Sequence, residues 1–213
     1  MKVYDATFTI HKQIPVWPDD PIPQWQVLTS LTEGSVATTR AIQMSLHTGT
    51  HVDAPGHVLA HGISVAQLPI STLVGPATLI EVPFDHTAIT RDFLQSCPIE
   101  PGSRLLFKTR NSHLWQEKGL HFTTDYVAFT PDAAAYLVNL QVLLVGTDGF
   151  SVDQFTSTKL PAHQIFLQNN VVIIELINLT QIAAGQYFLI TAPLKITPAD
   201  GAPARVYLIE NFS

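Results

Sequence analysis

The spacing of hydrophobic and polar residues along the first half of the chain predicts strands with little helix between them. Val3–Ile10 alternates apolar and polar side chains, as a half-buried strand does. Pro15–Pro23 interrupts that pattern as a rigid, proline-rich loop. Thr90–Ser96 is expected to be a short helix with Thr90 as its amino-terminal cap. The further strands expected in this half are Gln24–Leu31, Thr38–Leu46, Val74–Val82 and Arg104–Thr109.

Beyond residue 130 the pattern changes to alternating helices and strands. Proline begins both expected helices, in the first turn, where its missing N–H costs no hydrogen bond. These helices are Pro131–Leu140 and Pro161–Gln168, and the strands are Val142–Val145, Val171–Ile177, Tyr187–Ile190 and Arg205–Glu210. Many strands with a few helices between them indicate an α/β fold, built on a mixed sheet or on two packed sheets. The pattern does not give the strand order.

Length and composition add two expectations. The chain has 213 residues, so we expect one domain, residues 1–213, around one core. Charged residues make up 13% of the chain, against about 25% in a typical soluble domain. Because so few charges cover the surface, we expect part of it to be buried between subunits of a homo-oligomer. The alternative is a strand-rich protein that exposes Thr, Gln, Asn and Ser in place of charges.

Charge and local composition argue against several classes of partner. The formal net charge is −6 and the eleven Lys and Arg are scattered, so we expect no nucleic-acid partner. No apolar run approaches the roughly 20 residues of a membrane helix, so we expect no membrane partner. The first residues, MKVYDATFTI, lack the pattern of a signal peptide, and the single cysteine, Cys97, excludes an intrachain disulfide. A cytoplasmic enzyme acting on a small molecule fits these features.

Candidate chemistry is concentrated in residues 47–61, HTGTHVDAPGHVLAH. Four side chains of metal-ligand type are separated by 4, 2 and 4 residues: His47, His51, Asp53 and His57. In an extended strand the Cα atoms of His47 and His51 would lie about 13 Å apart, too far for both imidazoles to bind one ion easily. Glycine, proline and β-branched residues disfavour a helix here. We therefore expect a folded metal-binding loop, with a tight turn at Thr48–Thr50 and a second bend at Pro55–Gly56.

A simpler interpretation is that histidines gather on a polar surface loop. That interpretation suits His61, which lies outside the regular spacing. It does not account for the remaining three histidines and one aspartate around two glycine-containing turns. We therefore predict metal binding by the spaced residues and a surface position for His61.

Glu175 is a second, independent candidate, because it lies among the six aliphatic residues of Val171–Ile177. A buried carboxylate costs several kcal/mol unless it is paired or coordinated. The alternative is an edge strand with Glu175 facing water. His163 lies twelve residues upstream, in the first turn of an expected helix. One helix and one strand can return both side chains to the same end of the sheet, where we expect them to complete the site.

With these residues the chain resembles the cyclase-type metal-dependent hydrolases, a family that includes bacterial kynurenine formamidases and isatin hydrolases. His47–His57 matches every fixed position of the family motif H-x-G-T-H-x-D-x-P-x-H. Similar stretches elsewhere are PVWPDD at 15–20, LPAH at 160–163 and APLKITPADGAPAR at 192–205. The resemblance, which extends over nearly the whole chain, implies an α/β fold of the swivelling β/β/α type. It implies a single domain with a mixed, strand-rich sheet core and a few helices, assembled as a homodimer or homotetramer.

The resemblance also implies a role for each candidate residue. The implied metal ligands are His47, His51, Asp53, His163 and Glu175, with Asp53 bridging two ions. His57 would donate and accept protons. Trp17 would line the substrate pocket, although loop packing is an equal alternative. The implied cofactors are two zinc ions per chain, with manganese as the other possibility.

These features imply hydrolysis of a small amide C–N bond, in an aryl formamide such as N-formylkynurenine or in a cyclic amide. The metal ions would activate water and polarise the carbonyl, and His57 would carry a proton to the leaving amine. A lyase, a dehydratase or an ester or lactone hydrolase on the same metals is an alternative, as is a metal-stabilised binding protein. Three departures from formamidases bear on the substrate: Val58 in place of an aromatic residue, Gly149–Phe150 in place of a shorter turn, and Asp20 in place of a glycine.

Overall fold

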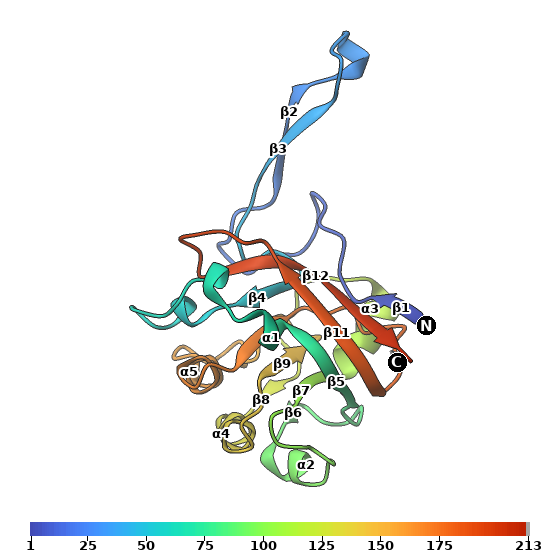
Figure 1. Ribbon diagram of the computed structural model, residues 1–213. Helices are drawn as coiled ribbons and strands as arrows, with labels where there is room; N and C mark the ends of the chain where they lie inside the picture. The colour runs from blue at the N-terminus through green and yellow to red at the C-terminus, as the bar shows by residue number, and fades with distance from the viewer. Residues whose placement is uncertain (212–213) are drawn as a thin grey trace.

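One closed sheet forms the centre of the computed structural model, which describes residues 1–211 (Figure 1). The eight strands have the order β1-β12-β11-β5-β7-β9-β10-β4. Because β12 pairs with β4 as well as with β11, the sheet closes into a barrel, and β1 is added beside β12. The strands are β1 (Lys2–Asp5), β4 (His51–Asp53), β5 (Val74–Glu81), β7 (Arg104–Lys108), β9 (Leu144–Thr147), β10 (Val172–Glu175), β11 (Gly185–Pro193) and β12 (Gly201–Glu210).

The sheet is mixed. Strands β5, β7, β9 and β10 are parallel neighbours, whereas the pairings of β4, β11 and β12 are antiparallel. Parallel neighbours need long crossover connections, and the helices of this chain lie mainly in those connections. The expected α/β fold with a mixed, strand-rich sheet is therefore confirmed. Of the two expected arrangements, the core has one mixed sheet and not two packed sheets, because the main sheet closes into a barrel.

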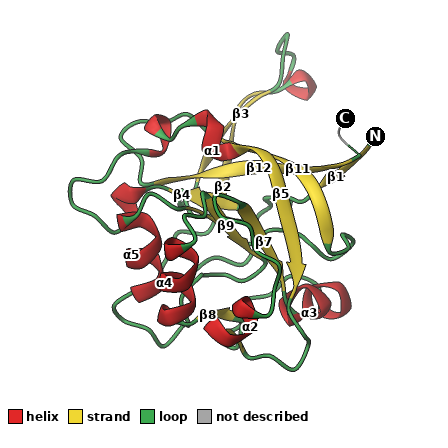
Figure 2. Cartoon of the chain, turned by 60° about the horizontal axis from the view of Figure 1, so that its bottom comes forward, coloured by secondary structure: helices red, strands yellow, loops and turns green. Residues whose placement is uncertain are grey.

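Within residues 1–211 there are five α-helices: α1 (Ile70–Leu73), α2 (Arg91–Gln95), α3 (Arg110–Lys118), α4 (Pro131–Asn139) and α5 (Pro161–Gln168). Helices α2, α4 and α5 lie on the outer side of the parallel strands (Figure 2). Thr90 caps α2 as predicted, because its hydroxyl accepts a hydrogen bond from the Phe93 N–H. The sequence pattern does not predict α3, whose residues RNSHLWQEK are mostly polar.

Alternation along the strands divides the core into two parts. On β7, Leu106 faces the barrel interior, whereas Leu105 and Phe107 pack towards the helices. On β10, Ile174 faces the interior and Ile173 faces the helices. Since successive side chains of a strand point to opposite faces, the residue after Ile174 returns to the helix side. That alternation places the carboxylate of Glu175 outside the barrel wall, beneath α5.

A separate two-stranded hairpin projects from the barrel (Figure 1). It consists of β2 (Gln24–Thr29) and β3 (Thr39–Gln43), with a short 3₁₀ helix, Leu31–Glu33, near its tip. Both strands were expected from the sequence, but not their separation from the main sheet. A further pair of two-residue strands, β6 (Ala88–Ile89) and β8 (Ala128–Phe129), lies near α2.

Several predicted boundaries are wrong. The strand expected at Val3–Ile10 ends at Asp5, after which Thr7 makes only an isolated bridge to Ile177. The strand expected at Val142–Val145 begins at Leu144, because the Val142 N–H still bonds back to the carbonyl of Leu137 in α4. Cys97 is free and partly buried just after α2, and its thiol lies 3.4 Å from the Phe93 carbonyl. No described helix has the length and apolar character needed to cross a membrane.

Candidate functional site

The histidine-rich segment folds back on itself as predicted. Gly49 has a φ of +69°, a conformation that favours glycine, and it turns the chain sharply between the first two histidines. The ring centroids of His47 and His51 are consequently 5.0 Å apart. A 3₁₀ turn at Pro55–His57 then brings the His57 ring centroid to 4.3 Å from that of His47. The expected loop contains one short strand, β4, that the sequence pattern did not predict.

Strand register places three candidate side chains together. In the antiparallel pair of β4 and β10, Glu175 is opposite His51 and Ile173 is opposite Asp53. Directly opposite residues present their side chains on the same face. Because Ile173 faces the helices, His51, Asp53 and Glu175 share that outer face, and Glu175 has an exposed fraction of only 5%. The edge-strand alternative for Glu175 is thereby excluded.

His163 reaches the same place from the first turn of α5. Leu160 precedes the helix with a φ of 45°, and Pro161 begins it. Asp153 orients this turn: its carboxylate accepts hydrogen bonds from the N–H groups of Ala162 (2.9 Å) and His163 (3.0 Å), and it lies 2.7 Å from the His163 Nδ1 atom. The Nε2 atom of His163 is left to face β4 and β10.

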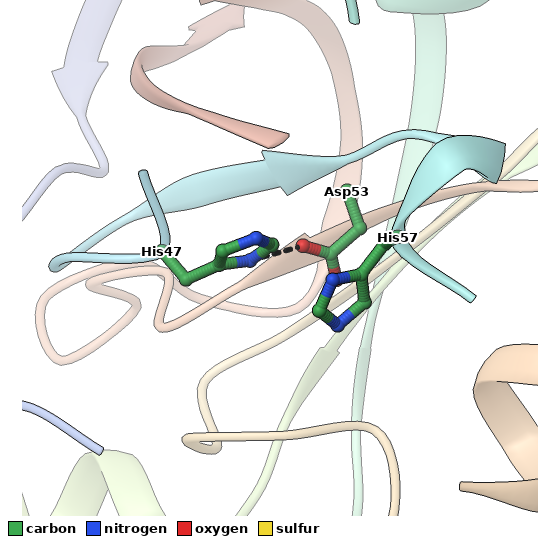
Figure 3. Close-up of side chains that lie close together, drawn as sticks. All are labelled: His47, Asp53 and His57. Carbon is green, nitrogen blue, oxygen red and sulfur yellow. Dashed lines mark ion pairs between the residues drawn. The ribbon is translucent and has the colours of Figure 1, made fainter. Parts of the chain in front are cut away.

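Asp53 is the centre of the resulting cluster (Figure 3). Its Oδ1 atom lies 2.9 Å from His47 Nδ1 and 3.4 Å from His51 Nε2, and its Oδ2 atom lies 3.5 Å from His163 Nε2. Glu175 lies across the cluster, with Oε2 3.4 Å from His51 Nε2 and Oε1 3.2 Å from His163 Nε2. All the predicted ligands therefore converge, and His57 lies beside them. His61 is exposed, as predicted.

Each imidazole near Asp53 has an oxygen acceptor on its other side. His51 Nδ1 lies 2.8 Å from the Gly49 carbonyl, and His163 Nδ1 is paired with Asp153. His47 Nε2 lies 2.8 Å from Asp200 Oδ2. Such outer partners fix the tautomer and direct the free nitrogen lone pair inwards, an arrangement that recurs around metal-binding histidines.

The unpaired atoms of the cluster fit a divalent metal ion. Both carboxylate oxygens of Asp53 and the Nε2 atom of His51 are buried without a hydrogen-bond partner, although His47 Nδ1 is close to Oδ1. Buried polar atoms without partners are costly, and a cation would satisfy all three. Two ligand groups, each with its ligand atoms within 4.8 Å of one another, share Asp53: His47–Asp53–His57 and His51–Asp53–Glu175. Imidazole and carboxylate ligands suit zinc and similar ions.

The charged groups of this cluster also shift one another's pKa values. Burial lowers the pKa of His51, but Asp53 and Glu175 outweigh burial and raise this pKa to about 10. Glu175 and Asp153 similarly outweigh burial at His163, whose pKa is raised well above its ordinary value. Burial and Asp53 raise the pKa of Glu175, yet His163 and His51 lower it to about 2. A metal ion entering this cluster would therefore displace protons from the imidazoles.

A cavity of about 220 Å³ opens onto the cluster. Apolar and aromatic side chains form much of its wall: Val16, Trp17, Phe150, Leu160 and Leu176. Trp17 also packs against the rings of Phe122 and Phe155, with centroid separations of 5.8 and 5.4 Å. Trp17 therefore lines this cavity and also packs on aromatic rings from two other segments of the chain. The cavity suits a flat apolar group whose reactive end reaches the histidines.

Sequence reasoning missed Asp153 and Asp200 and misplaced one residue. Asp200 Oδ2 contacts His57 Nδ1 at 3.3 Å as well as His47. Asp200 lies inside the similar stretch 192–205, and that position is the signal that could have identified it. The comparison of Asp20 with a glycine is wrong by one position. Asp19 adopts the left-handed conformation, with a φ of 73°, which a glycine would favour.

Comparisons with known proteins agree with this geometry. The family model Cyclase, described as "Putative cyclase", matches residues 4–154. A kynurenine formamidase from Salinibacter ruber is 34% identical over 98% of this chain and 97% of its own length. A solved structure described as a potential metal-dependent hydrolase with cyclase activity is 36% identical, with a TM-score of 0.84 over 97% of this chain and 96% of its own. Isatin hydrolase A from Labrenzia aggregata shares the fold, with a TM-score of 0.83 at 24% identity over 97% and 93% of the two chains. The chain belongs to the Cyclase family of metal-dependent hydrolases.

Proposed function

We propose that this protein is a metal-dependent amidohydrolase that cleaves the C–N bond of an aryl formamide, such as N-formylkynurenine, or of a cyclic amide. One observation carries the proposal: the unpaired oxygens of Asp53 lie among imidazoles at the end of a cavity with an aromatic wall. The kynurenine formamidase relative supports the amide as substrate class. We also propose that the protein acts in the cytoplasm.

Five side chains would hold the metal: His47, His51, Asp53, His163 and Glu175. We propose two ions per chain, zinc or manganese, because both oxygens of Asp53 are buried without a partner, with His47 and His51 beside Oδ1 and His163 beside Oδ2. When bound, such ions supply Lewis acidity, which makes water acidic near neutral pH and polarises a carbonyl. The outer partners Gly49 and Asp153 keep the imidazoles of His51 and His163 aimed at the centre.

His57 would carry the proton. Its side chain retains an exposed fraction of 25% and lines the cavity, and Asp200 engages its Nδ1 atom. The Nε2 atom is thereby left to take a proton from water and deliver it to the leaving amine. Trp17 and Phe150 would hold the aryl group flat against the wall and limit access of bulk water.

The metal is tested first. Metal content per chain should be measured on the purified protein, together with hydrolysis of N-formylkynurenine, isatin and an aryl lactone. Activity should disappear with a chelator and return with zinc or manganese. Two ions per chain with no amide turned over would refute the substrate class but retain the metal site.

The role of His57 is tested by substitution. His57→Asn should lower kcat about 10²- to 10⁴-fold, the usual contribution of general acid–base catalysis, while metal content stays unchanged. His61→Asn is the matched control, since His61 is an exposed histidine of the same segment. If His57→Asn loses a metal ion, His57 is a ligand together with His47 and Asp53, and the proton-carrier assignment is wrong.

A further inference from the structure

Asp20 is a charged residue of the candidate site that has no part in the function proposed above. It lines the same cavity as Trp17, His57 and Phe150. Among residues 1–211, no side chain pairs with its carboxylate by a hydrogen bond or an ion pair. Taking a charge partly out of water without a partner costs free energy. An unpaired carboxylate on the wall of this cavity is therefore available to a ligand.

A tight turn fixes Asp20 beside Trp17. The Asp20 N–H donates a 3.0 Å hydrogen bond to the Trp17 carbonyl, and Asp19, the third residue of the turn, has a φ of 73°. With Pro18 in second position, these are the features of a type II turn, whose first and fourth Cα atoms lie within about 7 Å. Trp17 and Asp20 are half-buried, whereas the two residues between them are exposed. The turn thus points its tip to solvent and keeps the indole and the carboxylate at the cavity.

The cavity differs in charge between its inner and outer parts. His51 and His163 are buried at the inner end, among the proposed metal ligands. Trp17, Asp20 and Leu160 are half-buried and form the outer part. No lysine or arginine is among the described residues that line the cavity. A ligand with a carbonyl at the inner end and a cation at the outer end fits this distribution, whereas an outer carboxylate would be repelled by Asp20.

We propose that Asp20 is a specificity-determining residue that binds an ammonium group of the substrate, carried on the part of the aryl formamide remote from the formyl group. This inference rests on the proposed function, because it assumes that the formyl group meets the metal ligands. The ring would lie against Trp17, and the ammonium would form a charge-assisted hydrogen bond with Asp20. An amino-acid side chain on the ring, as in N-formylkynurenine, supplies such an ammonium.

The test uses three formanilides with an ortho acyl chain that ends in an ammonium, a methyl or a carboxylate group. In the wild-type protein kcat/KM should be about fivefold higher for the ammonium compound than for the methyl compound, the effect of a solvent-accessible ion pair. The carboxylate compound should have the lowest value. Asp20→Asn should abolish the preference for ammonium, and Asp20→Lys should make the carboxylate compound the best of the three.

Asp19→Asn is the matched control. It removes the same charge from the neighbouring residue, which is exposed and is not among the described residues that line the cavity. Asparagine also tolerates the positive φ at this position. The variant should keep the preference for ammonium. The inference is overturned if the wild-type protein shows no such preference, or if Asp19→Asn reduces it as much as Asp20→Asn does.

Binding measurements separate this inference from the proposed function. If the zinc-loaded protein hydrolyses none of the three compounds, the proposed formamide substrate is wrong. Calorimetry on the same protein then decides the role of Asp20 without turnover. The ammonium compound should bind about fivefold more tightly than the methyl compound, and Asp20→Asn should remove the difference. Equal or undetectable binding of both compounds would reject the role of Asp20.

Discussion

Replacing Asp153 tests whether a residue that is not itself a proposed metal ligand positions His163, which is one. Its carboxylate is buried and serves two backbone N–H groups at the start of α5 and the imidazole of His163. In Asp153→Ala all three donors lose their acceptor. A buried donor left unpaired costs about 1–3 kcal/mol, and removal of a buried carboxylate relieves part of that cost. We therefore expect a net loss of about 3 kcal/mol in the free energy of unfolding.

For a chain of this length such a loss lowers the melting temperature by about 6–12 °C, at about 2–4 °C per kcal/mol. Metal affinity should fall about 10- to 100-fold, because the ring of His163 is no longer oriented. The assays are thermal unfolding of the metal-free protein and a chelator-competition titration with zinc. Each measures the role of Asp153 without relying on activity.

Asp132→Ala is the matched control. Asp132 is also an aspartate in the first turn of a helix, α4, but its side chain is exposed. It should change neither melting nor metal affinity appreciably. If Asp153→Ala matched Asp132→Ala in both assays, the assigned role of Asp153 in orienting His163 would be refuted.

Three further outcomes are expected. The metal-free protein should be most stable between about pH 4.5 and 6.5. Above that window, the stabilisation from the raised pKa of His51 is lost as the pH rises towards 10. Below it, the stabilisation from the lowered pKa of Glu175 is lost as the pH falls towards 2. Melting curves measured across this pH range check both limits. Asp200→Asn should weaken both metal binding and turnover, since Asp200 contacts two histidines, and a change in turnover alone would contradict this. Trp17→Ala should raise KM about tenfold for aryl formamides and much less for formamides without a ring, in steady-state kinetics on both substrates.

Local features of the site could be predicted from the sequence. Glycine and proline correctly predicted the two bends of the metal-binding loop, and proline correctly predicted the first residue of α5. The aliphatic neighbours of Glu175 correctly indicated its burial. These inferences depend on conformations and solvation costs that belong to a few adjacent residues.

Long-range features could not be predicted in that way. The contact between His47 and Asp200 joins residues 153 positions apart, and no local conformational preference of either segment specifies it. The hairpin of β2 and β3 shows a similar limit, because the alternation in Gln24–Thr29 is the same whether the strand joins the barrel or projects from it. The pairing of β12 with β4 is a third case, since it depends on closure of the whole sheet.

That pairing has a consequence for how the protein matures. Strand β4 is only three residues long and is bonded on one side to β10 and on the other to β12, the last of the described strands. The ligands on β4 and β10 therefore meet only after the chain has been made through Glu175, and pairings so distant in sequence form slowly. A cation that binds only the completed site favours the closed barrel over open forms by mass action. Metal supply during synthesis should then govern how much of the nascent protein reaches its finished state, in addition to how active it becomes.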